Sequence, residues 1–79
     1  MSERVYVLIE TQVGKTKGTV KAIQGVKRVK SVDAVTGPYD AIAVIEAETL
    51  KEIIDLVMAS IQPMDGISRT VTCIALKGF

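Results

Sequence analysis

Apolar runs and mixed stretches alternate twice along the chain. The runs VYVLIE (residues 5–10) and AIAVIEA (residues 41–47) are each followed by a longer mixed stretch and then by an apolar segment led by a glycine, Gly25 or Gly66. Short apolar runs between turn residues are typical of strands, and longer periodic stretches are typical of helices. The pattern predicts two βαβ halves that meet at the turn around Gly37.

The second mixed stretch has a strong helical pattern. Thr49 and Glu52 have the spacing of a capping box, which marks the start of the helix. Pro63 disfavours the helical conformation of the residue before it and marks the end. Five apolar residues at i, i+3, i+4, i+7 and i+11 predict one buried stripe: Leu50, Ile53, Ile54, Val57 and Ile61.

The first mixed stretch is a weaker helix. Gly18 disfavours helix, and β-branched residues surround it. We nevertheless expect a helix here because the repeat calls for one and Gly25 supplies an end signal. The expected buried stripe is Thr16, Val20 and Ile23.

Both apolar runs lack the alternation of apolar and polar residues that is typical of a strand with one face in water. Continuous apolar strands indicate a sheet that is covered on both faces. Two helices can cover one face, so we expect a second subunit to cover the other. The fold class is therefore predicted as α+β, a ferredoxin-like βαββαβ domain over residues 1–79. Its four-stranded antiparallel sheet has the order 4-1-3-2, with two helices on one face and dimerisation through the other.

Composition narrows the options for stability and location. With 79 residues, no histidine and Cys73 as the only cysteine, the chain can form neither an internal disulfide nor a common zinc site. A domain this small then relies on oligomerisation. Its apolar runs are too short to cross a membrane, and its first residues lack the features of a signal peptide. We expect a cytoplasmic protein in which Cys73 is a reduced, buried thiol.

Charge is distributed unevenly along the chain. Residues 1–30 hold seven bases and two acids (+5), whereas residues 31–79 hold three bases and seven acids (−4). We interpret these charges as solvated faces that complement one another within or between subunits. A basic patch for DNA or RNA is the alternative.

Residues that could carry catalysis are scarce. Histidine, the commonest general base, is absent, a lone cysteine cannot form a CxxC pair, and GKTKG lacks the spacing of a phosphate-binding loop. Three aromatic residues are too few for an RNA-recognition sheet. We therefore predict a non-enzymatic domain with no catalytic residue, no metal and no cofactor. A small monooxygenase-type barrel enzyme and a purely structural oligomerisation unit remain the alternatives.

Four marks occur in a fixed order along the chain. They are Gly25-Val26, Gly37-Pro38-Tyr39-Asp40, Glu46-Ala47 and Arg69-Thr70-x-Thr72. In this order and spacing the chain resembles, from about Val5 to Leu76, the C-terminal domain of the Lrp/AsnC (feast/famine) transcriptional regulators.

The resemblance implies a module that binds an amino acid effector and oligomerises as a dimer or as an octamer of four dimers. The ligand-binding residues it implies are Gly37, Pro38, Tyr39, Asp40, Thr70 and Thr72. Asp40 would receive the ammonium group, donors around the turn and the threonine hydroxyls would hold the carboxylate, and Tyr39 would line the pocket. In the plainer interpretation, Asp40 orders its own turn. Interface roles fall to Tyr6, Leu8 and Arg69.

The chain departs from the family at its beginning, where typical members carry a DNA-reading helix-turn-helix. Here position 1 already leads into the first strand. We therefore expect a stand-alone effector domain that acts through full-length Lrp/AsnC regulators, without direct contact to nucleic acid or membrane.

Overall fold

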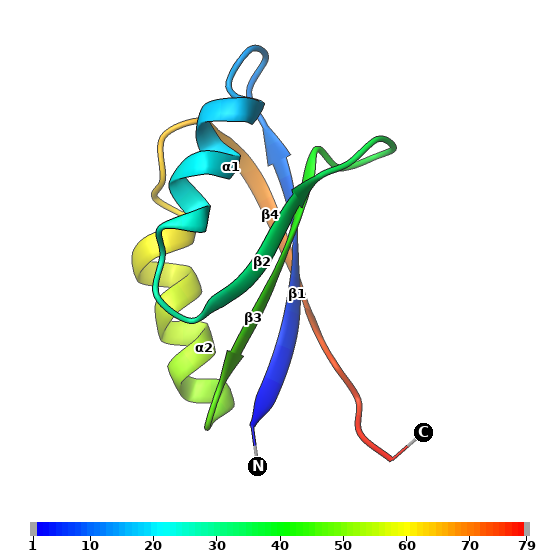
Figure 1. The fold of residues 1–79 in the computed structure, drawn as a ribbon, viewed down its shortest axis with the longest axis vertical. Helices are drawn as coiled ribbons and strands as arrows, with labels where there is room; N and C mark the ends of the chain where they lie inside the picture. The colour runs from blue at the N-terminus through cyan, green and yellow to red at the C-terminus, as the bar shows by residue number, and fades with distance from the viewer. Residues whose placement is uncertain (1, 79) are drawn as a thin grey trace.

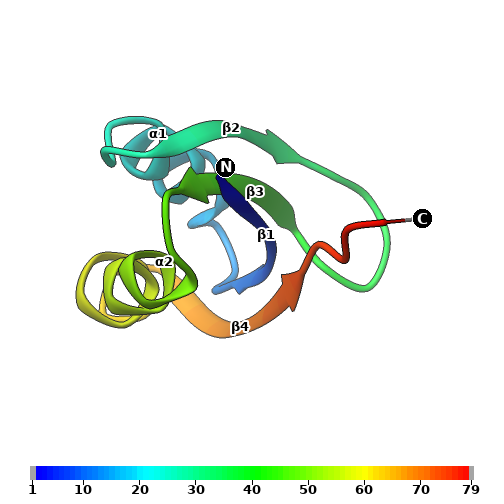
Figure 2. The same cartoon turned by 90° about the horizontal axis from the view of Figure 1, so that it is seen from below.

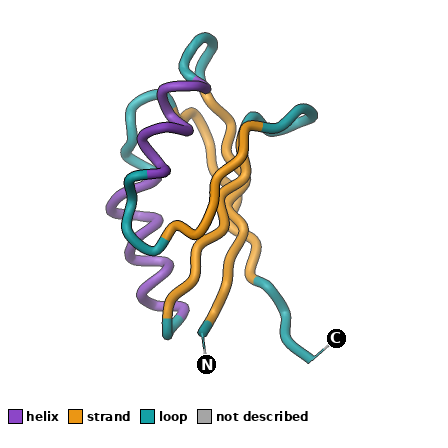
Figure 3. Tube along the Cα trace, in the orientation of Figure 1, coloured by secondary structure: helices purple, strands orange, loops and turns teal. Residues whose placement is uncertain are grey.

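The computed structural model describes residues 2–78 as a four-stranded sheet with helices on one face (Figures 1 and 3). The strands pair antiparallel in the order β2-β3-β1-β4, which confirms the predicted ferredoxin-like topology. Figure 2 shows that both helices lie on the same side of the curved sheet. The elements, in chain order, are β1 (Glu3–Thr11), α1 (Thr16–Gln24), β2 (Val29–Ala34), β3 (Ala41–Ala47), α2 (Leu50–Leu56), the π-helical turn η1 (Val57–Ile61) and β4 (Ile67–Ile74).

The core lies between the sheet and the helices. Alternate residues of the central strands β1 and β3 point into it, because successive side chains of a strand face opposite sides. The fully buried residues include Val5, Val7 and Ile9 of β1 and Ala41, Ala43 and Ile45 of β3. The small alanines of β3 leave room for the large Ile23, Ile53 and Ile61 of the helices.

The second helix buries a narrower stripe than the sequence predicts. Ile53, Val57 and Ile61 are buried and Leu50 is partly buried, but Ile54 is 37% exposed, so the prediction for Ile54 is wrong. The buried residues are four apart, and Ile54 is turned outward from that line. The last turn is wider than an α-helix, with Gln62 N–H donating to the Val57 carbonyl at 2.8 Å.

The predicted capping box is half formed. The Thr49 hydroxyl accepts from Glu52 N–H at 3.2 Å, as expected. The Glu52 carboxylate does not return to Thr49 but accepts from Glu48 N–H at 3.2 Å. The predicted start of the helix is therefore correct, and the reciprocal bond lies one residue earlier.

The first helix buries Thr19 and Ile23, whereas Thr16 and Val20 are only half-buried. The cause lies in the other half of the repeat. Gly66 comes so close to α1 that a Cβ atom on it would be 2.4 Å from Thr19 Oγ1. The Thr19 hydroxyl, 3.4 Å from the Asp65 carbonyl, donates to it. A helical wheel treats Thr19 as a polar position and cannot anticipate this contact.

The two helix-to-strand connections have the same backbone form. Just before the strand begins, Arg28 has φ 76° and Gly66 has φ 93°. Gly66 therefore corresponds to Arg28, and not to Gly25 as the sequence repeat suggests. Gly25 does end α1, but with φ −84°. Two backbone hydrogen bonds close each connection. In the first half, Val26 N–H donates to Ile23 O (2.9 Å) and Val29 N–H donates to Val26 O (3.3 Å). In the second half, Met64 N–H donates to Ile61 O (3.1 Å) and Ile67 N–H donates to Met64 O (3.3 Å).

The second face of the sheet is uncovered in the single chain. Its centre is apolar and is formed by Tyr6 and Leu8 of β1, Ile42 and Val44 of β3, and Val71 and Cys73 of β4, as the strand register shows. Cys73 is exposed, so the prediction of a thiol buried within the chain is wrong. Because successive residues of a strand face opposite sides, Cys73 lies on the open face, whereas its neighbours Thr72 and Ile74 lie on the helix side.

Ion pairs join the two halves of the repeat. Arg4, Lys15 and Arg28 of the basic first part lie 2.6, 3.5 and 3.7 Å from carboxylate oxygens of Glu46, Asp65 and Glu52, respectively, in the acidic second part. The charge asymmetry along the sequence is thus partly compensated within one subunit. None of the helices in residues 2–78 has the length and apolarity needed to span a membrane.

Candidate functional site

The turn between β2 and β3 extends beyond the sheet (Figure 1). Val35 N–H donates to the Asp40 carbonyl at 2.9 Å and closes its base. Gly37 and Pro38 are exposed at its tip, and Gly37 has φ 119°, a conformation that a residue with a Cβ rarely adopts. The turn thus needs Gly37, while Tyr39 and Asp40 fold back against the sheet.

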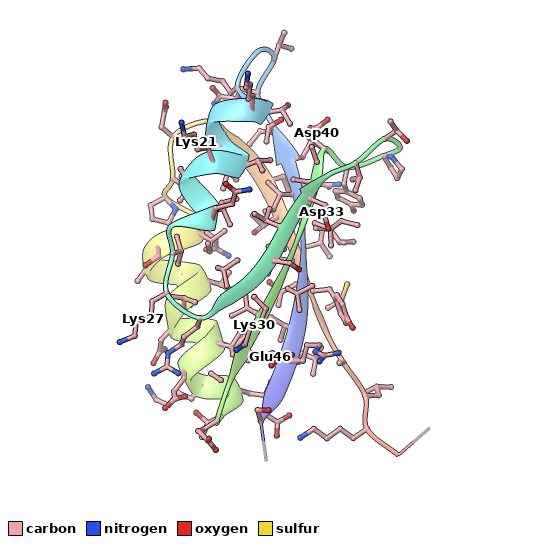
Figure 4. All side chains as sticks on the ribbon, in the orientation of Figure 1. Lys21, Lys27, Lys30, Asp33, Asp40 and Glu46 are labelled. Atoms are coloured by element: carbon pink, nitrogen blue, oxygen red, sulfur yellow. The ribbon has the colours of Figure 1, made fainter. Side chains whose placement is uncertain are left out.

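Asp40 fastens the turn to the end of β1. Its N–H donates to the Ile9 carbonyl at 2.8 Å, and its Oδ2 accepts from Thr11 N–H at 2.8 Å. The Asp40 carboxylate thus has a structural contact, but this contact joins the turn to β1 and is not a bond within the turn. An ionised carboxylate has about four acceptor sites, so the half-buried Asp40 can still receive a further donor. Figure 4 shows Asp40 at one end of the sheet and Glu46 toward the other.

A pair of hydroxyl groups connects this anchor to the first helix. Thr11 Oγ1 and Thr16 Oγ1 are 2.6 Å apart, and Thr16 is the first residue of α1. The sequence analysis did not single out Thr11. No pattern in the sequence marks Thr11, because its contacts with Asp40 and Thr16 form only in the folded chain.

Tyr39 lies against a charged pair on the open side of the sheet. The Arg69 guanidinium carbon is 6.0 Å from the centroid of the Tyr39 ring. Arg69 Nη2 is also 3.8 Å from Glu10 Oε2. A guanidinium at this distance from a ring face is attracted by the ring quadrupole. The turn, β1 and β4 therefore meet at Tyr39, Glu10 and Arg69.

The two predicted threonines lie on the opposite side of β4. Thr70 and Thr72 are paired with Ile9 and Val7, whose side chains are buried on the helix side, whereas Arg69 is paired with Glu10 on the open side. One chain thus gathers Tyr39, Asp40 and Arg69 at one corner but does not bring Thr72 to them. Thr70 lines a hollow of about 290 Å³ at the free edge of β4 with Gln62, Ile67, Ser68 and Arg69.

The predicted interface residues Tyr6 and Leu8 both lie on the open sheet face. Tyr6 is 37% exposed, and Leu8 is half-buried beside Val71. Hydrogen bonding to Tyr6, and secondly to Glu46, raises the pKa of the Arg4 guanidinium above its ordinary value. Arg4 therefore keeps its positive charge on this face. Within residues 2–78 no group of three metal-binding side chains is close enough to hold an ion.

Comparison with solved structures identifies chains of nearly the same extent. TTHA0845 from Thermus thermophilus superimposes with a TM-score of 0.91 and 30% identity, covering 98% of this chain and 96% of that one. FFRP-DM1 superimposes with a TM-score of 0.89 and 30% identity, covering 94% of this chain and 99% of that one. A search of curated proteins returned no significant match.

A more distant structure shows the same fold within a longer protein. The transcriptional regulator NMB0573 from Neisseria meningitidis, solved as an L-Met complex, has a TM-score of 0.84 at 13% identity, covering 95% of this chain and 50% of that one. At this identity the likeness concerns the fold alone. Family assignment depends instead on the sequence profile described as "Lrp/AsnC ligand binding domain", which matches residues 4–79. This chain belongs to the Lrp/AsnC ligand-binding domain family.

Proposed function

We propose that this domain binds a free amino acid at the corner formed by the β2–β3 turn and thereby adjusts transcription through an Lrp/AsnC-type partner. The family assignment over residues 4–79 carries the effector-binding function. The amino acid as ligand class is supported by the residues of the corner. An amino acid presents an ammonium and a carboxylate, and the corner offers the carboxylate of Asp40 and the guanidinium of Arg69.

In this proposal Asp40 receives the ammonium with the oxygen that Thr11 N–H leaves free, and Tyr39 borders the ligand side chain. The hydroxyls of Thr70 and Thr72 lie on the other side of β4, so in the complete site they come from a neighbouring subunit. The proposal therefore includes oligomerisation, with the open sheet face and its residues Tyr6 and Leu8 as the first interface. It includes no catalytic step and no cofactor.

DNA recognition is assigned to the partner. Both helices between residues 2 and 78 pack on the sheet and provide its core. Neither is free to enter a major groove as a recognition helix does. We propose that a regulator carrying such a helix supplies the sequence reading and that this chain joins it through a shared interface.

A thermal-shift screen with the twenty common amino acids tests the proposal. A ligand at 100 times its dissociation constant stabilises a protein by about 2.7 kcal/mol, which raises the melting temperature of a small domain by roughly 10 °C or more. Two variants at Asp40 separate the ligand role from the turn role. Asp40→Asn keeps an acceptor for Thr11 N–H but removes the charge, whereas Asp40→Ala removes both.

We expect a few related amino acids to raise the melting temperature of the wild type. Asp40→Asn should melt close to the wild type without ligand and respond weakly or not at all to the same amino acids. Asp40→Ala should melt lower, by the equivalent of about 1 kcal/mol, because a backbone donor loses its partner. An undiminished response of Asp40→Asn would rule out the ammonium role of Asp40. The absence of any response in the wild type would count against an amino acid effector altogether.

A further inference from the structure

The basic residues of the chain divide into two groups. Six of the ten lie within 4 Å of a carboxylate in residues 2–78, namely Arg4, Lys15, Arg28, Lys51, Arg69 and Lys77. The other four have no such partner in this part of the chain. They are Lys17, Lys21, Lys27 and Lys30, and all are exposed. The unpaired bases thus come from one continuous stretch of 14 positions, 17–30.

The fold brings this stretch to one side of the molecule. Lys17 and Lys21 lie on α1, Lys27 lies in the connection that follows, and Lys30 lies on β2, the strand on which α1 chiefly packs. Figure 4 shows Lys21 and Lys27 pointing away from the molecule on the α1 side, with Lys30 on the neighbouring strand. We call the surface formed by these four lysines the α1–β2 basic side.

Its residues favour a polyanion over a protein partner. Stable protein interfaces need buried apolar or aromatic anchors at their centre. The large exposed hydrophobic residues are Tyr6, Val13, Ile54, Met58, Ile74 and Leu76, and none of them lies between residues 15 and 34. Nucleic-acid interfaces are instead polar and strongly positive.

A second copy of the chain is a poor match for this surface. Six of the nine acids are in ion pairs, and Asp40 accepts a backbone N–H. Among the described residues only Asp33 and Glu48 have neither kind of partner. A copy would therefore bring two free carboxylates to four free ammonium groups.

Protection of the sheet edge does not explain all four unpaired lysines. Lysines on an edge strand prevent edge-to-edge pairing, and β2 is an edge strand. That reason covers Lys30 but not Lys17 and Lys21, which lie on the helix. Lys21, in the last turn of α1, complements the helix dipole, but Lys17 lies in the first turn, where a cation is unfavourable and no acid is present.

We propose that the α1–β2 basic side contacts the phosphodiester backbone of nucleic acid without reading its sequence. From the sequence we predict no direct nucleic-acid contact, with a basic patch as the alternative, and the four exposed lysines favour that alternative. Phosphate contacts need only placed cations, and they supply essentially all of non-specific binding. Lysine suits this role as a hydrated point charge on a flexible stem.

Fluorescence anisotropy with a short labelled DNA duplex of mixed sequence tests this proposal. Four phosphate contacts give a slope of about −3.6 in log affinity against log salt, so affinity falls roughly a hundred-fold between about 50 and 200 mM. A variant combining Lys17→Gln, Lys21→Gln and Lys30→Gln should reduce the steepness of this slope by about 3 and bind at least tenfold more weakly at low salt. A second duplex of unrelated sequence should bind as tightly as the first.

The matched control combines Lys15→Gln, Lys51→Gln and Lys77→Gln, which changes net charge equally but removes lysines that each have a carboxylate partner. It should keep the wild-type slope, and thermal melting should show that both triple variants are folded. Equal weakening by both variants would overturn the proposal, as would failure of the wild type to bind at low salt. Tighter binding of poly-glutamate than of the duplex would assign the surface to an acidic protein instead. None of these outcomes depends on binding of an amino acid.

Discussion

At the scale of single residues, two positions with the same backbone conformation carry different constraints. Arg28 and Gly66 both have positive φ at the end of a helix-to-strand connection. The surface at Arg28 leaves room for a side chain, which reaches Glu52. At Gly66 the side chains of Thr19 and Lys15 occupy that space. Close packing of the two halves, rather than φ alone, requires glycine at position 66.

Gly66→Ala and Gly14→Ala separate these two causes. Gly14 also has positive φ, 78°, but no atom lies within 4 Å of the place its Cβ would take. Gly14→Ala should therefore lower the free energy of unfolding by about 1 kcal/mol, the cost of the backbone conformation. Gly66→Ala should lower it by roughly 2–5 kcal/mol, because overpacking adds to that cost. Urea denaturation measures both, and equal losses would contradict the packing explanation.

At the scale of elements, the sequence predicts those features of the helices and strands that depend on residue patterns along the chain. Helix limits, the Thr49 cap and the strand order all follow from periodicity, capping residues and the repeat. The buried faces of the helices follow less well, because Thr19 is buried by Gly66 from the other half and Ile54 is turned outward. These depend on contacts between distant segments, which a helical wheel does not contain.

The same limit applies to the candidate site. Tyr39 and Asp40 could be singled out because a turn does not require them. Their partners Thr11, Glu10 and Arg69 come from three-dimensional pairing of β1 with the turn and β4. Thr70 and Thr72 lie on the other side of the sheet from Arg69, which strand alternation already predicts once residues 67–74 are taken as a strand.

The cap of the second helix provides a test at this scale. Thr49→Ala leaves Glu52 N–H without its side-chain acceptor and should lower the free energy of unfolding by about 1 kcal/mol. Thr49→Ser keeps the hydroxyl and serves as the control, with a loss of at most a few tenths of a kcal/mol expected on the same scale. Chemical denaturation followed by circular dichroism distinguishes them. Similar losses in both variants would mean that the hydroxyl contributes nothing to the helix.

At the scale of the whole molecule, the open sheet face is the surface through which we propose that the domain pairs. Its apolar centre is flanked by the Arg4–Glu46 and Arg69–Glu10 pairs, so a second copy can cover the centre and leave the charges at the rim. Cys73 lies on this face and is exposed in the single chain, so its reactivity reports on whether the face is covered.

Val44→Lys tests pairing through this face. A lysine at the apolar centre should shift sedimentation toward the monomer, because burial of an unpaired charge is costly. In the same variant a thiol reagent should label Cys73 at least tenfold faster than in the wild type. Val13→Lys, at a fully exposed loop position, is the control and should change neither sedimentation nor the rate at which Cys73 is labelled. If Cys73 in the wild type reacts as fast as a free thiol, the sheets do not pair through this face.

The central position of β1 also has a consequence for how the chain folds. β1 precedes the other three strands of the sheet in sequence, and it pairs on one side with β3 and on the other with β4, so that Val5 lies opposite the distant Ile74. Contacts between segments so far apart close slowly, because the entropy of a long loop must be lost first. One edge of β1 therefore stays unpaired during folding until β4 joins the sheet. The open edge of this central strand is therefore the place where a partly folded chain can pair with another chain.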